Sequence, residues 1–374
     1  MNHDALLIGG MRFKKINAST HRMVGIAKLF KPVSRNVFLY GVGEDKEEGF
    51  YEDFQYKTAV YPKTTKEWIH FYVSAKKYID LIRSNKQIKY VVVSGAVPSI
   101  PTIKIAKYCK KHNIRFIFDI GEWYTNSYKF IKRVIKGFDT FLKMHNICKN
   151  YKNYIVASSF LEKHCTSRGS KKNILVIPAI VSNIIPNIKK EKDYHDVIKL
   201  SFIGYLEKNN LKENLSPLIS AIEEFNLSHS LKFRLSVVGS EGENSESVIY
   251  YGEQPYKESI NHLVESNFSV IPRSKTRKNE SGFPTKLSES FLYRIPVIST
   301  DTSDIKHYII DGKNGYLISS NTKQCFLDCF KKIENEIKIN GNYFNAFAEN
   351  VVKYNKLKIQ YFEDSFINFF NTLW

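Results

Sequence analysis

Short apolar runs recur along the whole chain, and helix-length segments separate them. In the first half, the runs lie at residues 5–10, 36–42, 90–95, 114–120 and 154–159. In the second half, they lie at residues 198–204, 233–239, 248–252, 268–272 and 295–299. Strands that are apolar throughout and alternate with helices are typical of parallel sheets covered on both faces. Two such series predict an α/β chain with two doubly wound, Rossmann-like domains.

The boundary between the domains is predicted within residues 178–196, where prolines, asparagines and mixed charges interrupt the pattern. A chain of 374 residues is also too long for one ordinary core. We therefore expect an N-terminal domain at 1–185 and a C-terminal domain at 195–355. A C-terminal helix at about 356–374 is expected to pack back on the first domain. Ligands of such sheets bind beyond the carboxyl ends of the strands, so a cleft between two facing domains is the expected site.

The net charge of +19 is concentrated in one half of the chain. Residues 1–188 hold 32 Lys and Arg against 13 Asp and Glu, whereas residues 189–374 hold 24 of each kind. A basic half attracts nucleic acid, an anionic membrane or an anionic substrate, and general solubility is the alternative explanation. The sequence contains no recognised nucleic-acid-binding module, so no nucleic-acid partner is expected.

The composition argues against several other classes of protein. No run of about 18 apolar residues could span a bilayer, and the N-terminus lacks the basic and apolar regions of a signal peptide. The five cysteines are scattered, which predicts free thiols in a reducing cytoplasm. Neither an Asp-x-Asp motif nor a histidine cluster is present, so neither a metal site nor a cofactor is predicted.

Cations follow the apolar strands of the second half. They are Lys208 and Lys212 after the run at 198–204, and Arg273, Lys275, Arg277, Lys278 and Lys286 after the run at 268–272. The last of these lies in SGFPTKLSES (281–290), where Gly282 permits a close backbone approach and Pro284 suits the first turn of a helix. The N–H groups and dipole of a helix start favour an anion such as a diphosphate.

Glu289 lies about one helical turn beyond Lys286. Its carboxylate can accept hydrogen bonds from vicinal hydroxyls, as an acidic residue does with ribose in other nucleotide sites. Phosphates at the helix start and ribose at Glu289 together predict a nucleotide site. The alternative is that Glu289 only complements the helix dipole or pairs with a lysine.

Residues 280–318 resemble the donor-site signature of family 4 glycosyltransferases, which are retaining enzymes of the GT-B fold. The matching positions are Gly282, Phe283, Glu289, Pro296, Val297, Ile298, Asp311, Gly312, Asn314 and Gly315. A variant subgroup with G-F-P-T-K in this place is similar. Residues 17–30, 152–165 and 174–182 resemble other segments of the family more loosely. The resemblance implies two Rossmann-like domains facing across a cleft, with a nucleoside-diphosphate sugar in the C-terminal domain and an acceptor in the N-terminal domain.

The resemblance also implies roles for individual residues. By it, Glu289 binds the ribose of a UDP- or GDP-sugar, Lys212 neutralises the leaving diphosphate, and Gly204 lies near the donor. The other expected donor-binding residues are Gly10, Arg273, Ser281, Gly282, Phe283, Pro284, Thr285 and Lys286. Ser281 stands where the family has a sugar-contacting glutamate, and Glu280 is one place away. The identity of the donor sugar is therefore expected to depend on the surroundings of Ser281.

The first strand of the N-terminal half ends at a glycine pair. Gly9 and Gly10 border the cleft in the expected fold, and a simple tight turn is the alternative. Ser19 or Thr20 is predicted to cap the helix that follows. Arg22, in the first turn of that helix, either reaches an anionic acceptor or is solvated.

The segment 128–145 predicts a basic, aromatic helix. Its apolar residues at helical spacing are Phe130, Val134, Phe138 and Phe141, and its basic residues are Lys129, Lys132, Arg133 and Lys136. Such a helix can lie on an anionic bilayer, where each basic group contributes on the order of 1 kcal/mol. The alternative is a helix whose apolar side packs on the core. A second basic face is predicted nearby, formed by Lys104, Lys107, Lys110 and Lys111.

Together with the resemblance, these features predict a retaining, metal-independent, hexosyltransferase-type glycosyltransferase. Lys212, Arg273 and Lys286 would stabilise the leaving diphosphate, which can itself take the acceptor proton. Asp119 and Glu122, after the strand at 114–120, are further catalytic candidates facing the cleft; hydrogen bonds to loop amides are their alternative role. The acceptor is expected to be a lipid-linked saccharide or a polysaccharide in surface polysaccharide biosynthesis. The protein is then cytoplasmic and peripherally bound to the inner face of the cell membrane.

Two alternatives remain open at this stage. One is another GT-B enzyme, either an inverting transferase or a nucleotide-sugar epimerase. The other is a non-catalytic subunit that docks a partner at the membrane. The serine at 281 favours the second alternative, whereas the retained cations and Glu289 oppose it; Gly121 also stands where the family often has a histidine.

Overall fold

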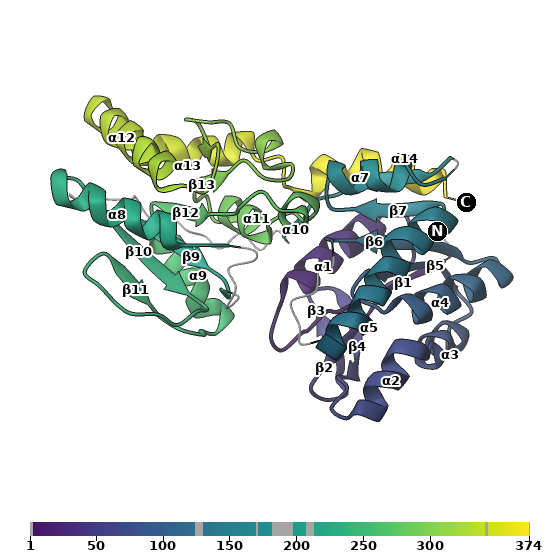
Figure 1. Cartoon of the computed structure of the whole chain (residues 1–374). Helices are drawn as coiled ribbons and strands as arrows, with labels where there is room; N and C mark the ends of the chain where they lie inside the picture. The colour runs from purple at the N-terminus through teal and green to yellow at the C-terminus, as the bar shows by residue number, and fades with distance from the viewer. Residues whose placement is uncertain are drawn as a thin grey trace. The chain divides into compact units, whose positions relative to one another are not determined.

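The computed structural model describes residues 3–123, 130–169, 171–181, 197–206, 213–340 and 343–373. The chain forms two compact units (Figure 1). Unit 1 comprises Met1–Ser182, Ser281–Phe283 and Lys358–Trp374, and unit 2 comprises Asn183–Glu280 and Pro284–Leu357. Each unit is an α/β structure around a mainly parallel sheet, as the apolar pattern predicts. Most of the predicted boundary segment, from residue 182 to 196, lies outside the described residues.

Unit 1 is built on an eight-stranded sheet in the order β3-β4-β2-β1-β5-β6-β7-β8. Its strands are β1 Asp4–Ile8, β2 Val37–Gly43, β3 Glu48–Tyr51, β4 Phe54–Val60, β5 Ile88–Ser94, β6 Arg115–Ile120, β7 Asn153–Val156 and β8 Asn173–Val176. The pairings are parallel except that of β3 with β4. Every residue of β1 and β7 is buried, which explains their continuous apolar runs. The apolar pattern missed β3 and β4, which exposed or half-buried polar positions interrupt, and it also missed the four-residue β8, although Ile174, Leu175 and Val176 are apolar.

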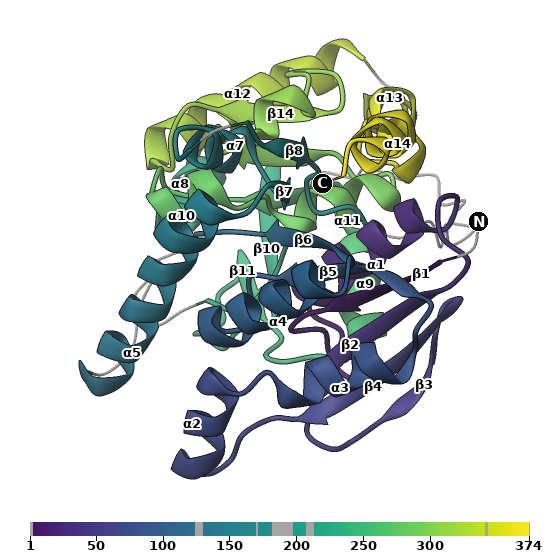
Figure 2. The same ribbon diagram turned by 90° about the vertical axis from the view of Figure 1, so that its right-hand side faces the viewer.

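The helices of unit 1 connect these parallel strands. They are α1 Ala18–Phe30, α2 Thr65–Val73, α3 Lys76–Ser84, α4 Ser99–Lys111, α5 Phe130–Phe141, α6 Cys148–Asn150 and α7 Ser159–Thr166, with a π-helical turn η1 Leu142–Ile147 after α5. Helix α4 packs against α2, α3 and α5 (Figure 2). Among the described residues, no helix combines the length and the apolar character needed to cross a bilayer.

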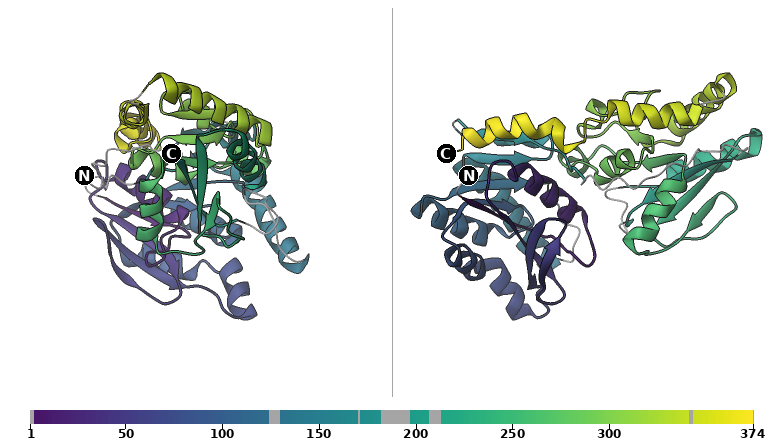
Figure 3. Two further views of the ribbon diagram at one scale, coloured as in Figure 1. Left: turned by 90° about the vertical axis from the view of Figure 1, so that its left-hand side faces the viewer. Right: turned by 180° about the vertical axis from the view of Figure 1, so that it is seen from behind.

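The last segment of the chain also belongs to unit 1. It forms η3 Ile359–Phe362 and α14 Glu363–Asn371, and α14 is drawn in yellow in Figure 3. The rings of Phe366 and Phe370 lie 4.9 and 6.0 Å from the ring of Phe30 in α1. The side chain of Asn173 in β8 donates a hydrogen bond to the carbonyl of Phe369 at 3.1 Å. Aromatic packing and this bond fix α14 on the core of unit 1.

Unit 2 is built on a six-stranded sheet in the order β11-β10-β9-β12-β13-β14. Its strands are β9 Val197–Ile203, β10 Lys232–Val238, β11 Val248–Tyr250, β12 Phe268–Ile271, β13 Val297–Thr300 and β14 Gly315–Ile318. All of the strand pairings are parallel. Counted from β9, this is the order 3-2-1-4-5-6 of dinucleotide-binding folds. The order reverses between β9 and β12, so a ligand site is expected beyond the ends of these two strands.

Helices cover both faces of the sheet of unit 2. They are α8 Ser216–Ser228, α9 Tyr256–Glu265, α10 Arg277–Ser281, α11 Thr285–Leu292, η2 Ile305–His307, α12 Lys323–Ile339 and α13 Tyr343–Tyr354. Leu200 and Phe202 point into the main core with α8, α12 and α13. Ile203, the next residue, points to a smaller cluster with Ile260 and Leu263 of α9. Both faces of β9 therefore pack against helices, and the sequence of β9 is mainly apolar apart from Lys199 and Ser201.

Candidate functional site

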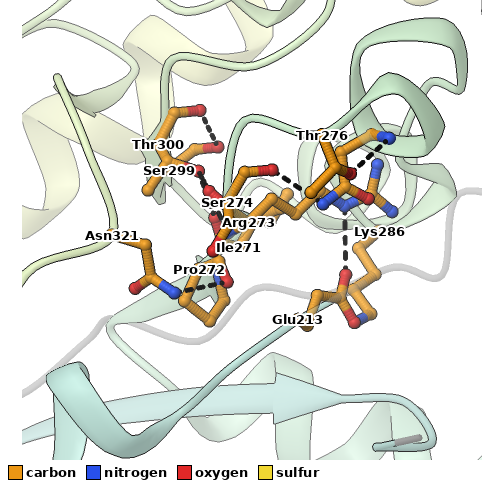
Figure 4. Close-up of polar contacts among 11 residues, drawn as sticks. Glu213, Ile271, Pro272, Arg273, Ser274, Thr276, Lys286, Ser299, Thr300 and Asn321 are labelled. Atoms are coloured by element: carbon orange, nitrogen blue, oxygen red, sulfur yellow. Dashed lines mark hydrogen bonds and ion pairs between the residues drawn. The ribbon is translucent and has the colours of Figure 1, made fainter. Parts of the chain in front are cut away.

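Three loops of unit 2 converge beyond the carboxyl ends of β9 and β12 (Figure 4). Glu213 lies in the connection after β9, Arg273 follows β12, and Lys286 lies in the first turn of α11. The side chains of these residues are joined by ion pairs. Gly204, directly after β9, lies against Lys286. The structure therefore brings three of the predicted donor-binding residues together at the point where the strand order reverses.

Glu213 is the centre of this cluster, and it was not predicted from the sequence. The Nε atom of Arg273 donates to Oε1 of Glu213 at 3.2 Å, and the Nζ atom of Lys286 donates to Oε2 at 2.5 Å. Glu213 and Arg273 are buried, whereas Lys286 is partly exposed. The partners of Glu213 lie 60 and 73 residues along the chain, so no local pattern indicated it. Arg273 and Lys286, which were predicted to bind a diphosphate, therefore share the carboxylate of Glu213 as their counter-ion.

Lys286 is held by more than its ion pair. Its ammonium lies 3.9 Å from the centre of the Phe202 ring, which is a cation–π distance. A Cβ atom at Gly204 would lie 2.7 Å from Nζ of Lys286, so a larger residue at that position would displace the ammonium. Gly204 is therefore required for the approach of Lys286 to the end of β9.

The backbone around Arg273 is also fixed. Its N–H donates to Oγ1 of Thr300 at 3.0 Å, and the Thr300 hydroxyl donates to the Arg273 carbonyl at 2.7 Å. The Asn321 side chain donates to the carbonyls of Asn214 and Pro272 at 3.0 and 3.2 Å. These bonds join the loops that follow β9, β12 and β14 to one another and to the end of β13. The charged cluster is consequently pre-organised.

The start of α11 faces the same site. Pro284 occupies its N-cap position and makes no side-chain cap, and the helix begins at Thr285. The sequence placed Pro284 in the first turn, one position too far in. An N-terminus without a side-chain cap leaves backbone N–H groups and the positive end of the helix dipole to attract an anion.

Glu289 lies one turn further along α11. It is half-buried, and the Tyr256 hydroxyl donates to its Oε1 at 3.4 Å. Burial raises the pKa of Glu289 to about 7, against the opposing effects of Tyr256 and Lys286. The carboxyl group therefore changes charge close to neutral pH. A hydroxyl donor that binds it would favour the ionised form.

Ser281 forms hydrogen bonds to other residues of unit 1. The backbone N–H of Trp123 donates to Oγ of Ser281 at 2.7 Å, and the Ser158 hydroxyl donates to the Ser281 carbonyl at 2.7 Å. Ser281, Gly282 and Phe283 are buried. The sequence placed these three residues in the C-terminal domain, whereas they group with unit 1 because of these bonds.

Glu280 differs from its neighbour. Its Oε1 atom is buried and has no hydrogen-bond partner among the described residues. A buried carboxylate oxygen without a partner is costly, unless a ligand completes its hydrogen bonds. Glu280 therefore has a carboxylate oxygen that accepts no hydrogen bond among the described residues. In Ser281, by contrast, both the hydroxyl and the carbonyl oxygen accept one.

Asp119 and Arg22 form a buried ion pair in unit 1. Arg22 donates to the Asp119 carboxylate at 2.6, 3.0 and 3.2 Å and to the carbonyl of Ile177 at 2.7 Å. Burial raises the pKa of Asp119, and the charge and hydrogen bonds of Arg22 oppose this rise. The prediction of a solvated Arg22 was wrong, because its guanidinium is buried against Asp119, whereas its contact with an acceptor stays a prediction. Asp119 is fully buried, and its carboxylate accepts from Arg22 rather than from loop amides, whereas its catalytic role stays a prediction.

The other predicted residues of unit 1 have separate positions. Gly10 follows β1, and its carbonyl accepts a hydrogen bond from the Asn17 side chain at 3.0 Å. Asn17 also caps α1, so the prediction of Ser19 or Thr20 as the cap was wrong. Glu122 is half-buried just after β6. Two predicted cations of unit 2, Lys208 and Lys212, lie outside the described residues.

Within the described ranges, no group of three or more His, Cys, Asp or Glu side chains is arranged to hold a metal ion. The five cysteines are free thiols. Cys325 is half-exposed, whereas the other four are buried.

Two kinds of comparison relate this chain to known proteins. Residues 181–350 match the family model described as Glycosyl transferases group 1, and this range covers nearly all of unit 2. No curated protein sequence matches the chain significantly. The family match thus concerns the unit that carries the cation cluster and Glu289.

Solved structures resemble the chain over its whole length. Sucrose-phosphate synthase from Thermosynechococcus elongatus is 11% identical with a TM-score of 0.67, and the match covers 99% of each chain. A glycosyltransferase from Rickettsia africae is 14% identical with a TM-score of 0.66 and the same coverage. Anabaena Alr3699/HepE, solved with UDP and glucose, is 9% identical with a TM-score of 0.67, over 99% of this chain and 100% of that chain. At such low identity the likeness concerns the fold, and it confirms the predicted GT-B architecture of two doubly wound domains.

Proposed function

We propose that this chain is a GT-B glycosyltransferase that binds a nucleoside-diphosphate sugar in unit 2 and transfers the sugar to a membrane-associated acceptor. The observation that carries this proposal is the convergence of Arg273, Lys286 and the start of α11 at the strand ends of the unit that matches the group 1 family. The structure solved with UDP and glucose, which shares this fold, supports a UDP-sugar as the first donor to test.

The diphosphate of the donor fits the start of α11. Its charge would be neutralised by Arg273, Lys286 and the helix dipole, and Lys212 would add a further cation. As the bond between the sugar and the phosphate breaks, negative charge develops on the leaving diphosphate. Cations held in place before the reaction stabilise this charge without reorganisation. The rigid loops around Arg273 supply this kind of pre-organisation.

Glu289 is proposed to accept hydrogen bonds from the ribose of the donor. It lies one turn into the helix whose N-terminus would receive the diphosphate, and acidic residues accept hydrogen bonds from ribose in other nucleotide sites. Glu280 is proposed to contact the sugar, because its buried Oε1 atom has an unused acceptor among the described residues. Ser281 has a positioning role in this proposal, since its hydroxyl and carbonyl oxygens accept bonds from unit 1.

The reaction is proposed to retain the configuration of the sugar and to require no metal ion. The bond between the anomeric carbon and the diphosphate oxygen breaks, and the acceptor oxygen bonds to the same face of that carbon. The acceptor proton passes to the leaving phosphate oxygen, so the proposal needs no separate base. Arg273 and Lys286 then balance the charge that a metal ion would otherwise balance.

The membrane part of the proposal rests on α5. Val134, Ile135, Phe138 and Phe141 expose between 48% and 60% of their surface, so the alternative of a core-packed apolar side does not describe this helix. The carboxyl end of α5 is fixed to unit 1, because Asp139 accepts a hydrogen bond from the backbone N–H of Ser99 at 2.6 Å. A fixed helix with an exposed apolar stripe in a basic half of the chain suits an anionic bilayer.

Two neighbouring helices extend this surface. Helix α2 has no buried residue, and its Ile69 and Val73 are exposed. Helix α4, which packs against both α2 and α5, contributes Lys104, Lys107, Lys110 and Lys111, all of them exposed. Apolar side chains can enter the lipid interface while these lysines bind its anionic head groups. The acceptor is therefore proposed to be a lipid-linked saccharide at the cytoplasmic face of the cell membrane, used in surface polysaccharide synthesis.

The donor is tested with a panel of UDP- and GDP-sugars, scored by thermal stabilisation and by slow hydrolysis. At least one sugar nucleotide should stabilise the protein, and binding of none would overturn the proposal. The anomeric configuration of the transferred sugar, measured by NMR, separates a retaining from an inverting reaction. Conversion of the donor into an epimer without any acceptor would identify an epimerase instead.

The membrane surface is tested with vesicles that contain phosphatidylserine. Phe138→Ser with Phe141→Ser should weaken vesicle binding by about tenfold or more, because each buried aromatic side chain contributes roughly 1.5–3 kcal/mol. Leu227→Ser is the matched control, since Leu227 is an exposed apolar residue of unit 2. Donor binding should be unchanged in both variants. Equal vesicle affinity of the double variant and the wild type would contradict the membrane role.

A further inference from the structure

We infer that Glu213 promotes release of the nucleoside diphosphate product by placing a fixed negative charge between the two cations that bind it. The inference rests on the proposed function, because it concerns the donor site of unit 2. Glu213 is a positioning residue in this role. It sets the orientation and the net charge of Arg273 and Lys286 without contact to the reacting atoms.

The charge balance of the cluster is the first observation. Each carboxylate oxygen of Glu213 has its own cation, with Arg273 at Oε1 and Lys286 at Oε2. Two cations and one anion leave a single net positive charge among these described residues. The pair with Arg273 is buried, so solvent screens it weakly. Glu213 therefore cancels one of the two positive charges that Arg273 and Lys286 offer to an incoming diphosphate.

The second observation is that the backbone of Glu213 is anchored. It forms an antiparallel bridge with Arg273, and the N–H of Asn214 donates to the carbonyl of Pro272 at 3.3 Å. The Asn321 side chain holds the carbonyls of both Asn214 and Pro272. The carboxylate therefore stays within a few ångströms of Arg273 and Lys286 when a ligand binds. A side chain on a free loop would instead be able to move away.

A fixed negative charge affects donor and product differently. In a nucleotide sugar the terminal phosphate is esterified and carries one charge. Transfer of the sugar frees that phosphate, whose second proton is lost with a pKa of about 6, so the product gains about one further charge at neutral pH. Repulsion grows with the charge of the ligand, so Glu213 weakens binding of the product more than binding of the donor.

The experiment compares the wild type with Glu213→Gln, which removes the charge and keeps the shape of the side chain. Affinities for UDP and UDP-glucose are measured by calorimetry, with GDP and GDP-mannose as a second pair. Glu213→Gln should bind the diphosphate about tenfold tighter or more, because a nearby charge in a partly buried site is removed. The sugar nucleotide should gain less, and kcat and KM should both fall as product release slows.

Glu224→Gln is the matched control. Glu224 pairs with Lys323 at 2.6 Å on the surface of the same unit, so this variant makes the same change in net charge away from the cluster. Its affinities should equal those of the wild type. If Glu213→Gln binds the diphosphate equally or more weakly, Glu213 only holds the cations in place, and the inference is wrong.

Two further measurements keep the result decisive. If Glu213→Gln is unstable, the charge effect is measured in the Lys286→Met background, where adding Glu213→Gln should again tighten diphosphate binding relative to Lys286→Met alone, and equal or weaker binding would overturn the inference. If the wild type binds no nucleotide sugar, the proposed function fails, whereas inorganic pyrophosphate still tests the inference. Pyrophosphate should raise the Tm of Glu213→Gln more than that of the wild type. An equal or smaller rise would overturn the role of Glu213.

Discussion

Buried carboxylates pair with arginine at strand ends in both units, and the two clusters differ in their charge balance. In unit 1, Asp119 faces one guanidinium, that of Arg22, and the pair is neutral and closed. In unit 2, Glu213 faces two cations, and Lys286 keeps part of its surface exposed. A buried ion pair with no net charge serves the fold alone. A cluster with excess positive charge that is partly accessible can in addition bind an anion. Charge balance thus separates a structural pair from a candidate ligand site better than burial alone.

The sharpest test of this comparison is Asp119→Asn. It should lower the free energy of unfolding of unit 1 by about 3–5 kcal/mol, because Arg22 would remain buried without its counter-ion. Tryptophan fluorescence during urea unfolding measures this, since all three tryptophans of the chain belong to unit 1. Asp53→Asn is the control, because Asp53 and its partner Lys31 are exposed, and it should change little. A variant with wild-type stability that loses only turnover would instead make Asp119 a catalytic group.

The next largest effect is expected for Lys286→Met. Methionine keeps the length of the side chain but cannot bind a phosphate, and hydrogen bonds to charged groups contribute about 2 kcal/mol. Donor affinity should therefore fall roughly thirtyfold, as calorimetry with a nucleotide sugar would show. Lys323→Met removes an exposed lysine of the same unit and should leave the affinity unchanged. Equal affinities of the wild type and Lys286→Met would remove Lys286 from the donor site.

A smaller effect is expected from pH, through Glu289. Its pKa of about 7 means that protonation competes with a ribose hydroxyl for the carboxylate below neutral pH. Affinity for a nucleotide sugar should rise by roughly tenfold from pH 6 to pH 7 or slightly above and then level off, since one proton is released on binding. A nucleotide sugar is the right probe because its esterified phosphates do not titrate in this range. Glu289→Gln should abolish the rise, and a rise that persists in that variant would assign the titration to another group.

Much of the fold could be predicted from the sequence. All ten predicted apolar runs correspond to strands, because strands that are mostly buried keep a mainly apolar sequence over five to seven residues. The strands that were missed lie toward the sheet edges, such as β3, where exposed positions break the pattern. Gly204, Arg273 and Lys286 were also predicted as members of one site, because the ends of parallel strands meet at one edge of a sheet.

Other features depended on which segments the fold brings together. The exposed stripe of α5 has the same helical spacing as a buried one, and only the absence of a covering element among the described residues distinguishes them. The hydrogen bonds of Ser281 to Trp123 and Ser158 join residues more than 100 positions apart. No local motif predicted these bonds of Ser281, and the contact to the donor that its motif predicts stays a prediction.

The sequence by itself determined the two α/β units, the kind of residue at each strand end and the amphipathic character of α5. These features depend on backbone periodicity and on burial within a few neighbouring residues, so a short stretch of the sequence is enough to predict each of them. Only the tertiary structure decided that Glu213 joins Arg273 to Lys286 and that Arg22 closes on Asp119. Such pairs link residues 60 to 97 positions apart, and the order of strands in each sheet, rather than any local pattern, sets which charges meet.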